Sequence, residues 1–168
     1  MKKIISMFIF LLLLVGCSLS NTPTSKVEEL LSKYQMLDSD IKEGINTVIE
    51  EESLTSEQKE RYRKIIEKQY KNLTYEIKDE KIDGNIAVIT TEIEVMDYKK
   101  IVNETNDSYL GRNDYTVEEY NNTKLNNLES AKDKVTYTID FEVIKDDNGN
   151  WKLSALNNEI IKKIQGMY

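Results

Sequence analysis

The chain has 168 residues, of which 30 are acidic and 23 are basic, and its formal net charge is −7. It contains no histidine and one cysteine, which excludes histidine-based triads, histidine-rich metal sites and disulfides within the chain. Because an acidic surface binds phosphate backbones poorly, we expect no nucleic-acid partner. The length suits one domain with a hydrophobic core of its own.

The first seventeen residues have the layout of an export signal. Two lysines give a basic start, residues 4–15 are apolar except for one serine, and Gly16 precedes the single cysteine, Cys17. This apolar stretch of twelve residues is too short to cross a bilayer, which takes about 20 residues. An ordinary secretory signal would also fit, but it would not require a cysteine at the cleavage point. The sequence therefore predicts that residues 1–16 are removed.

The tetrapeptide Leu14-Val15-Gly16-Cys17 resembles the lipobox of bacterial lipoproteins. The resemblance implies that a diacylglyceryl group is attached to the sulfur of Cys17, which becomes the new N-terminus. Two acyl chains hold a protein stably on a bilayer. We therefore expect a cell-membrane protein, lipid-anchored on the extracytoplasmic face. Cleavage would take the net charge to −9, so the membrane contact would rest on lipid and not on a basic patch.

Three helices are predicted after a short polar tether. Two of them begin at capping-box pairs, Ser25 with Glu28 and Thr55 with Gln58. Gln69 falls at the margin of the third apolar face. The apolar residues at helical spacing are Val27, Leu30, Leu31 and Tyr34; Ile41, Ile45, Val48 and Ile49; and Tyr62, Ile65, Ile66 and Tyr70.

The hydrophobic period then changes to two, which predicts a hairpin over residues 73–95 with its turn at Asp83-Gly84. One face of the returning strand consists of Ala87, Ile89, Thr91, Ile93 and Val95. The other face is apolar at Ile86 and Val88 but acidic further along. This pattern predicts a strand that begins in a two-sided core and ends in a one-sided core.

Residues 99–132 interrupt the strand pattern. We expect a polar loop over residues 103–114, followed by a helix that Thr116 caps. A second hairpin follows, with alternating residues 135–143, a turn at 147–150 and a short strand. Calcium-ligand spacing is not met at that turn. Asn157 or Asn158 then caps a last helix.

This order of elements predicts an α+β fold. The N-terminal helices pack on a curved antiparallel sheet of about four strands, with a helical excursion between the hairpins and a C-terminal helix. Residues 1–16 form the signal peptide, residues 17–24 the lipid anchor and tether, and residues 25–168 a single domain.

The domain also resembles the small uncharacterised lipoproteins of Gram-positive bacteria, and through them the NTF2-like (cystatin-like) superfamily. The latter resemblance implies a cone-shaped pocket between sheet and helices, although four strands and a terminal helix depart from the superfamily's pattern. The stretches that carry the resemblance are residues 22–35, Leu73-Thr74-Tyr75-Glu76-Ile77, Lys81-Ile82-Asp83-Gly84-Asn85 and residues 135–141.

Five residues are candidates for lining such a pocket: Tyr75, Asp97, Tyr98, Tyr137 and Asp140. An aspartate buried beside a tyrosine can have a raised pKa and act as a base. The stronger interpretation is that these tyrosines pack their rings and solvate their hydroxyls. Neighbouring residues on a strand also point to opposite faces, which separates these groups.

The sequence contains no glycine-rich phosphate loop, and its only thiol is assigned to lipid. We therefore expect no cofactor, no metal and no catalytic residue. The expected role is a non-enzymatic, membrane-anchored module that binds an unknown protein or small ligand. A small-molecule carrier or sensor is the alternative, and an enzyme that uses aspartate and tyrosine comes third.

Overall fold

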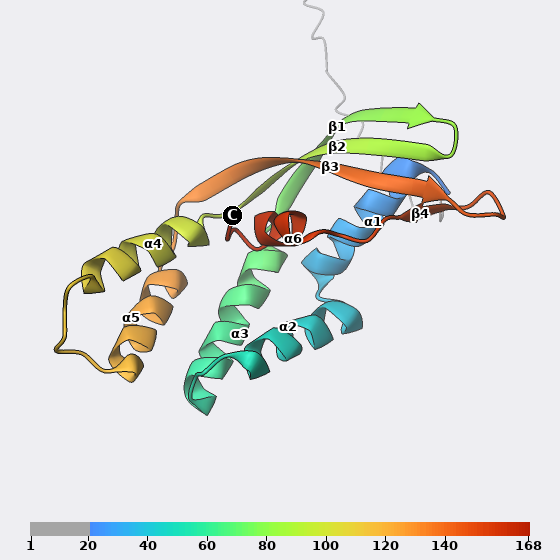
Figure 1. Cartoon of the computed structure of the whole chain (residues 1–168). Helices are drawn as coiled ribbons and strands as arrows, with labels where there is room; N and C mark the ends of the chain where they lie inside the picture. Colours follow the sequence, from blue (N-terminus) through green and yellow to red (C-terminus); the bar gives the residue numbers. More distant parts are fainter. Residues whose placement is uncertain (1–20) are drawn as a thin grey trace, which may run out of the picture.

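The computed structural model describes residues 21–168. Within them the chain forms an α+β fold in which six helices lie on one side of a four-stranded sheet (Figure 1). The helices are α1 (Pro23–Met36), α2 (Ser39–Glu51), α3 (Ser56–Lys71), α4 (Tyr98–Tyr109), α5 (Val117–Glu129) and α6 (Asn158–Ile164). The strands are β1 (Thr74–Asp83), β2 (Ile86–Met96), β3 (Lys134–Lys145) and β4 (Trp151–Leu153).

The sheet is antiparallel and open, with its strands in chain order. Along β2, buried side chains alternate with partly exposed ones, as a strand with one covered face requires. Figure 1 shows the β1–β2 and β3–β4 turns at one end of the sheet, while α4 and α5 leave from the other end. The predicted fold class and element order are confirmed.

Two hydrophobic clusters hold the helices. The larger lies between the inner face of the sheet and α1, α2, α3 and α6, with Leu31, Ile49 and Phe141 almost fully buried. The smaller joins α3 to the α4–α5 hairpin around Ile65 and Leu125. Because α3 contributes to both clusters, it connects the body of the domain to the hairpin.

The first helix begins earlier than predicted. Thr22 caps α1 and forms a reciprocal capping box with Ser25, so Ser25 with Glu28 is not the capping pair. Pro23 occupies the first turn, where its missing N–H costs nothing. The last two residues of the predicted tether are therefore helical.

The predicted polar loop over residues 103–114 is wrong for most of its length, because α4 continues to Tyr109. The physical reason is that Tyr98, Thr105 and Tyr109 are spaced along one face of a helix and are buried together. Thr105 is buried there although it is polar. Thr105 is satisfied inside the protein: it donates to the Ile101 carbonyl and accepts from Asn127.

The two-sided core predicted for the start of β2 is also wrong. Ile86 is 49% exposed, and no element within residues 21–168 covers the outer face of the sheet there.

The predicted turn after β3 is confirmed: Asp146 Oδ1 accepts hydrogen bonds from the backbone N–H groups of Asn148 and Asn150. No helix within residues 21–168 has the length and apolar character needed to span a bilayer.

Candidate functional site

The five residues predicted to share a pocket are not all brought together in one. Tyr75 and Tyr137 lie half-buried on the inner face of the sheet, each in register with Ile93 of β2. Asp97 caps α4 by accepting from the Lys100 N–H at 2.9 Å. Asp140 lies on the opposite, outer face, where it accepts from the Thr90 hydroxyl at 2.7 Å.

The inner face of the sheet is occupied around Tyr137. The Tyr137 hydroxyl donates to the backbone oxygen of Tyr168, and their rings meet edge to face with centroids 5.9 Å apart. Burial, and secondarily the charge of Asp97, raises the pKa of Tyr137. These contacts are packing contacts of the chain's C-terminal end.

A different pocket lies among the helices. It is a hollow of about 180 Å³ between α2 and α3 on one side and α4 and α5 on the other, closed by the residues that follow α6. We call it the interhelical pocket. Its lining is Val48, Glu52, Tyr62, Ile66, Gln69, Tyr70, Tyr98, Val102, Tyr120, Lys124, Leu128, Gln165 and Met167. Of the five predicted residues, only Tyr98 belongs to it.

A second hollow of about 290 Å³ adjoins the interhelical pocket across α2 and α3. The two share a wall made of Val48, Ile66, Tyr70 and Gln165. The two hollows therefore lie next to each other on the helical side of the domain. Such an apolar concavity with a few polar groups is the usual form of a small-ligand site.

The four tyrosines of the interhelical pocket are kept in their protonated form. Burial, with a smaller effect of Tyr62, raises the pKa of Tyr98 to about 12. Burial also raises the pKa of Tyr62, Tyr70 and Tyr120. They can pack their rings against a ligand and donate hydrogen bonds, but they are not bases near neutral pH.

Two charged residues from opposite walls complete the lining. Glu52 follows α2 and Lys124 belongs to α5. Lys124 Nζ lies 5.7 Å from the centroid of the Tyr120 ring. The pocket thus offers a cation and a carboxylate beside an apolar interior, an arrangement that suits a ligand with an apolar body and a polar end.

Gln69 closes the pocket toward the sheet. Although it was predicted at a helix margin, it is 1% exposed, and its Nε2 donates to the carbonyls of Met96 and Gln165, each at 3.0 Å. Its Oε1 accepts from the Met96 N–H at 3.0 Å. One side chain therefore fastens α3 to the end of β2 and to the chain that leaves α6.

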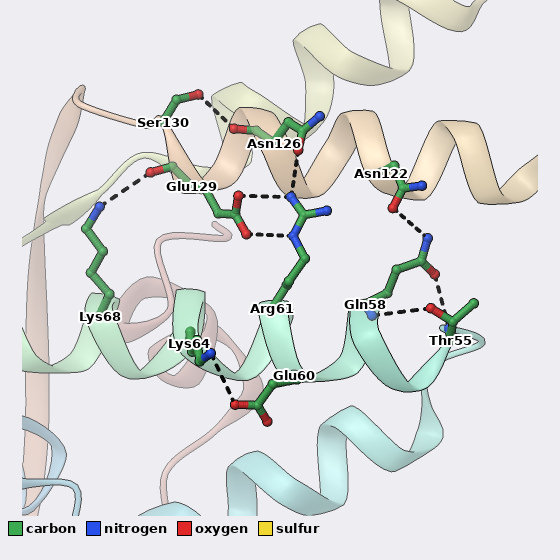
Figure 2. Close-up of polar contacts among 10 residues, drawn as sticks. All are labelled: Thr55, Gln58, Glu60, Arg61, Lys64, Lys68, Asn122, Asn126, Glu129 and Ser130. Carbon is green, nitrogen blue, oxygen red and sulfur yellow. Dashed lines mark hydrogen bonds and ion pairs between the residues drawn. The ribbon is translucent and has the colours of Figure 1, made fainter.

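A row of polar contacts fixes α5 against α3 on the outer side of the pocket (Figure 2). The Arg61 guanidinium binds both carboxylate oxygens of Glu129, at 2.8 and 2.9 Å, and donates to Asn126. Gln58 Nε2 donates to Asn122 Oδ1 at 2.9 Å. Figure 2 shows these side chains reaching across from one helix to the other, which sets the width of the pocket.

Two features of the sequence concern the helices around this site. Tyr98, Val102, Thr105 and Tyr109 are spaced as one helical face, which would have predicted α4. Gln58, predicted only as a cap partner, does form the capping box with Thr55 but also reaches α5. No pattern in the sequence indicates which helices lie opposite each other, so the pocket itself was not predictable from periodicity.

No cluster of three or more potential metal ligands occurs within residues 21–168. No protein-family model matches the chain, and no curated protein matches it. Among solved structures, the chain is similar to a candidate lipoprotein (ycdA) of Bacillus subtilis, with 14% identity and a TM-score of 0.43. The match covers 83% of this chain and 46% of that one, so this chain spans about half of its neighbour's length.

Proposed function

We propose that the protein is a lipid-anchored, extracytoplasmic binding module whose site is the interhelical pocket. The observation that carries the proposal is the apolar, tyrosine-lined hollow of about 180 Å³ with Glu52 and Lys124 on its walls. A cavity of roughly 150 Å³ is enough to take a benzene ring. The ligand class is a small aromatic or aliphatic group with a polar end.

A non-enzymatic role is part of this proposal. Its support is that burial raises the pKa of the pocket tyrosines, which therefore stay protonated near neutral pH. Membership of the NTF2-like superfamily is a hypothesis of the same kind. It implies a pocket between sheet and helices, whereas the hollow described above lies among the helices.

The pocket is tested with 2-naphthoate and 2-naphthol as probes, observed by saturation-transfer NMR. Val102→Trp should fill the pocket and abolish the signal of both probes. Val117→Trp, on the 71%-exposed side chain that begins α5, is the matched control and should leave both signals intact. Lys124→Met should weaken naphthoate alone, since only naphthoate carries a charge for the ammonium to bind. Equal binding to the two tryptophan variants would refute the site.

A second candidate function is protein binding by the tip of the α4–α5 hairpin. There Leu110 is 83% exposed and Val117 is 71% exposed, beside an aromatic cluster of Tyr109, Tyr115 and Tyr120. Exposed apolar residues on a rigid hairpin are typical of interaction surfaces. This function would be lost in Val117→Ser and kept in Val102→Trp, the reverse of the pocket's behaviour.

A further inference from the structure

The outer face of the sheet changes character along its length. At the end with the two turns, Ile86 and Ile144 face each other in register and are 49% and 42% exposed, with Val88 beside them. Beyond them the face becomes polar. The outward residues there are Thr90, Glu92, Glu94, Thr136, Thr138 and Asp140, while Glu142 is in register with Val88 itself. The aliphatic part is thus confined to one end.

The first described residue is fastened to this same end. The Trp151 N–H donates to Asn21 Oδ1 at 2.9 Å, and Asn21 Nδ2 donates to Asn150 Oδ1 at 3.2 Å. Thr24 bonds to Glu80 of β1. The start of the domain therefore has a fixed place beside the β3–β4 turn.

The predicted lipid attachment is close to that place in the sequence. Cys17 precedes Asn21 by four residues, which span at most about 14 Å when fully extended. A diacylglyceryl group on Cys17 would hold the turn end of the sheet near the membrane surface. The α4–α5 hairpin lies at the other end of the sheet (Figure 1).

We propose that the turn end of the sheet rests on the membrane, with Ile86 and Ile144 in contact with lipid; the inference depends on the lipid anchor of the proposed function. The outer face at Ile86 and Val88, which no described element covers, is then covered by the bilayer. Ile82, 54% exposed near the tip of the β1–β2 hairpin, lies at the same end but on the inner face, in register with Ala87.

Apolar contact and a short tether, not charge, drive this orientation. On the outer face Asp83 is in register with Ile86. The two nearby lysines are already paired, Lys81 with Asp79 at 3.3 Å and Lys152 with Asp146 at 2.9 Å. A short tether raises the effective concentration of a weak contact, so two half-exposed isoleucines suffice to bias the orientation. The interhelical pocket and the hairpin tip are then held away from the bilayer.

The test uses the full lipoprotein in vesicles of equal parts phosphatidylethanolamine and phosphatidylglycerol. Because the predicted lipid occupies the chain's single cysteine thiol, a nitroxide label can be placed on Ile144→Cys or Ile86→Cys. Thr138→Cys is the matched control, on the same face of β3 but about 20 Å nearer the other end. We expect the labels at 144 and 86 to be shielded from an aqueous nickel chelate and accessible to oxygen, and the control to be open to the chelate.

Each other result has a distinct meaning. If the protein floats with the vesicles but the three labels are equally open to the chelate, the orientation is wrong and the anchor stands. If it does not float, or if Cys17 reacts with the label, the anchor is wrong and the inference fails with it. Spin–spin broadening at 144 that disappears on dilution with unlabelled lipoprotein would show that a second copy, not lipid, covers this face.

Discussion

At the scale of single residues, the junction between α3, β2 and the end of α6 depends on a glycine. Gly166 has a positive φ of 68°, which side chains with a Cβ rarely adopt. An added Cβ would collide with the Met96 carbonyl oxygen and crowd Gln69 Nε2. The absence of a side chain at this position therefore allows Gln69 to make its contacts.

We predict that Gly166→Ala lowers the free energy of unfolding by about 3 kcal/mol or more, through backbone strain and the collision with β2. Urea unfolding followed by circular dichroism measures the change. The amide resonances of Met96 and Gln69 should shift as well, since the carbonyl has to move.

Gly44→Ala is the control for this prediction. Gly44 lies inside α2 with nothing within 4 Å of an added Cβ, so alanine should stabilise the protein by up to about 1 kcal/mol. If both alanine variants were equally stable, the close approach at Gly166 would not limit stability.

At the scale of elements, the sequence predicted what is local. The capping box at Thr55 and the caps at Thr116 and Asn157 are confirmed, as is the alternation of β3. Each depends on residues three or fewer positions apart, where side-chain chemistry decides the backbone. The loop predicted over residues 103–114 was wrong because the buried face of α4 includes Thr105. Its burial is explained only by a tertiary contact, the hydrogen bond from Asn127.

The packing of α5 on α3 is an element-scale contact that can be measured. The hydrogen bonds from Arg61 lower the pKa of Glu129. A lowered carboxyl pKa means that the ion pair stabilises the fold above the unfolded pKa of about 4.3 and that this stabilisation is lost as pH falls through the folded value.

We predict a coupling of about 0.5–1 kcal/mol between Arg61→Met and Glu129→Gln in a double-mutant cycle near neutral pH, and none in acid below the lowered pKa. Amide exchange of α5 should also accelerate. Arg63 and Glu60 form an ion pair within α3 and serve as the control, with a weaker coupling and no effect on α5. A coupling independent of pH would show that packing and not charge joins the helices.

At the scale of the whole molecule, the site arises from the way two clusters share one helix. The larger cluster fixes α2 and α3 to the sheet, and the smaller fixes α4 and α5 to α3. The interhelical pocket is the space left between these two assemblies. Its tyrosines come from three helices distant in sequence, so no local pattern could indicate that they would meet.

Two buried tyrosines, Tyr34 of α1 and Tyr98 of the interhelical pocket, make the stability of the whole domain sensitive to alkali. Burial raises the pKa of Tyr34 and of Tyr98 to about 12 from an ordinary 10.0. Since the unfolded chain releases these protons first, the free energy of unfolding should be unaffected by them below pH 10 and should fall between about pH 10 and 12. Urea midpoints across this range measure the loss.

Tyr34→Phe distinguishes the ionisation of the buried Tyr34 hydroxyl from the ionisation of other groups at high pH. The variant keeps the ring and removes the ionisable hydroxyl. The variant should unfold like the parent at pH 8 and lose less stability than the parent between pH 10 and 12. Tyr168→Phe, at a tyrosine that is 53% exposed, should follow the parent throughout. If the two variants lost stability equally, the alkaline transition would belong to the lysines, and the interior around α1 and α3 would be more hydrated than its packing indicates.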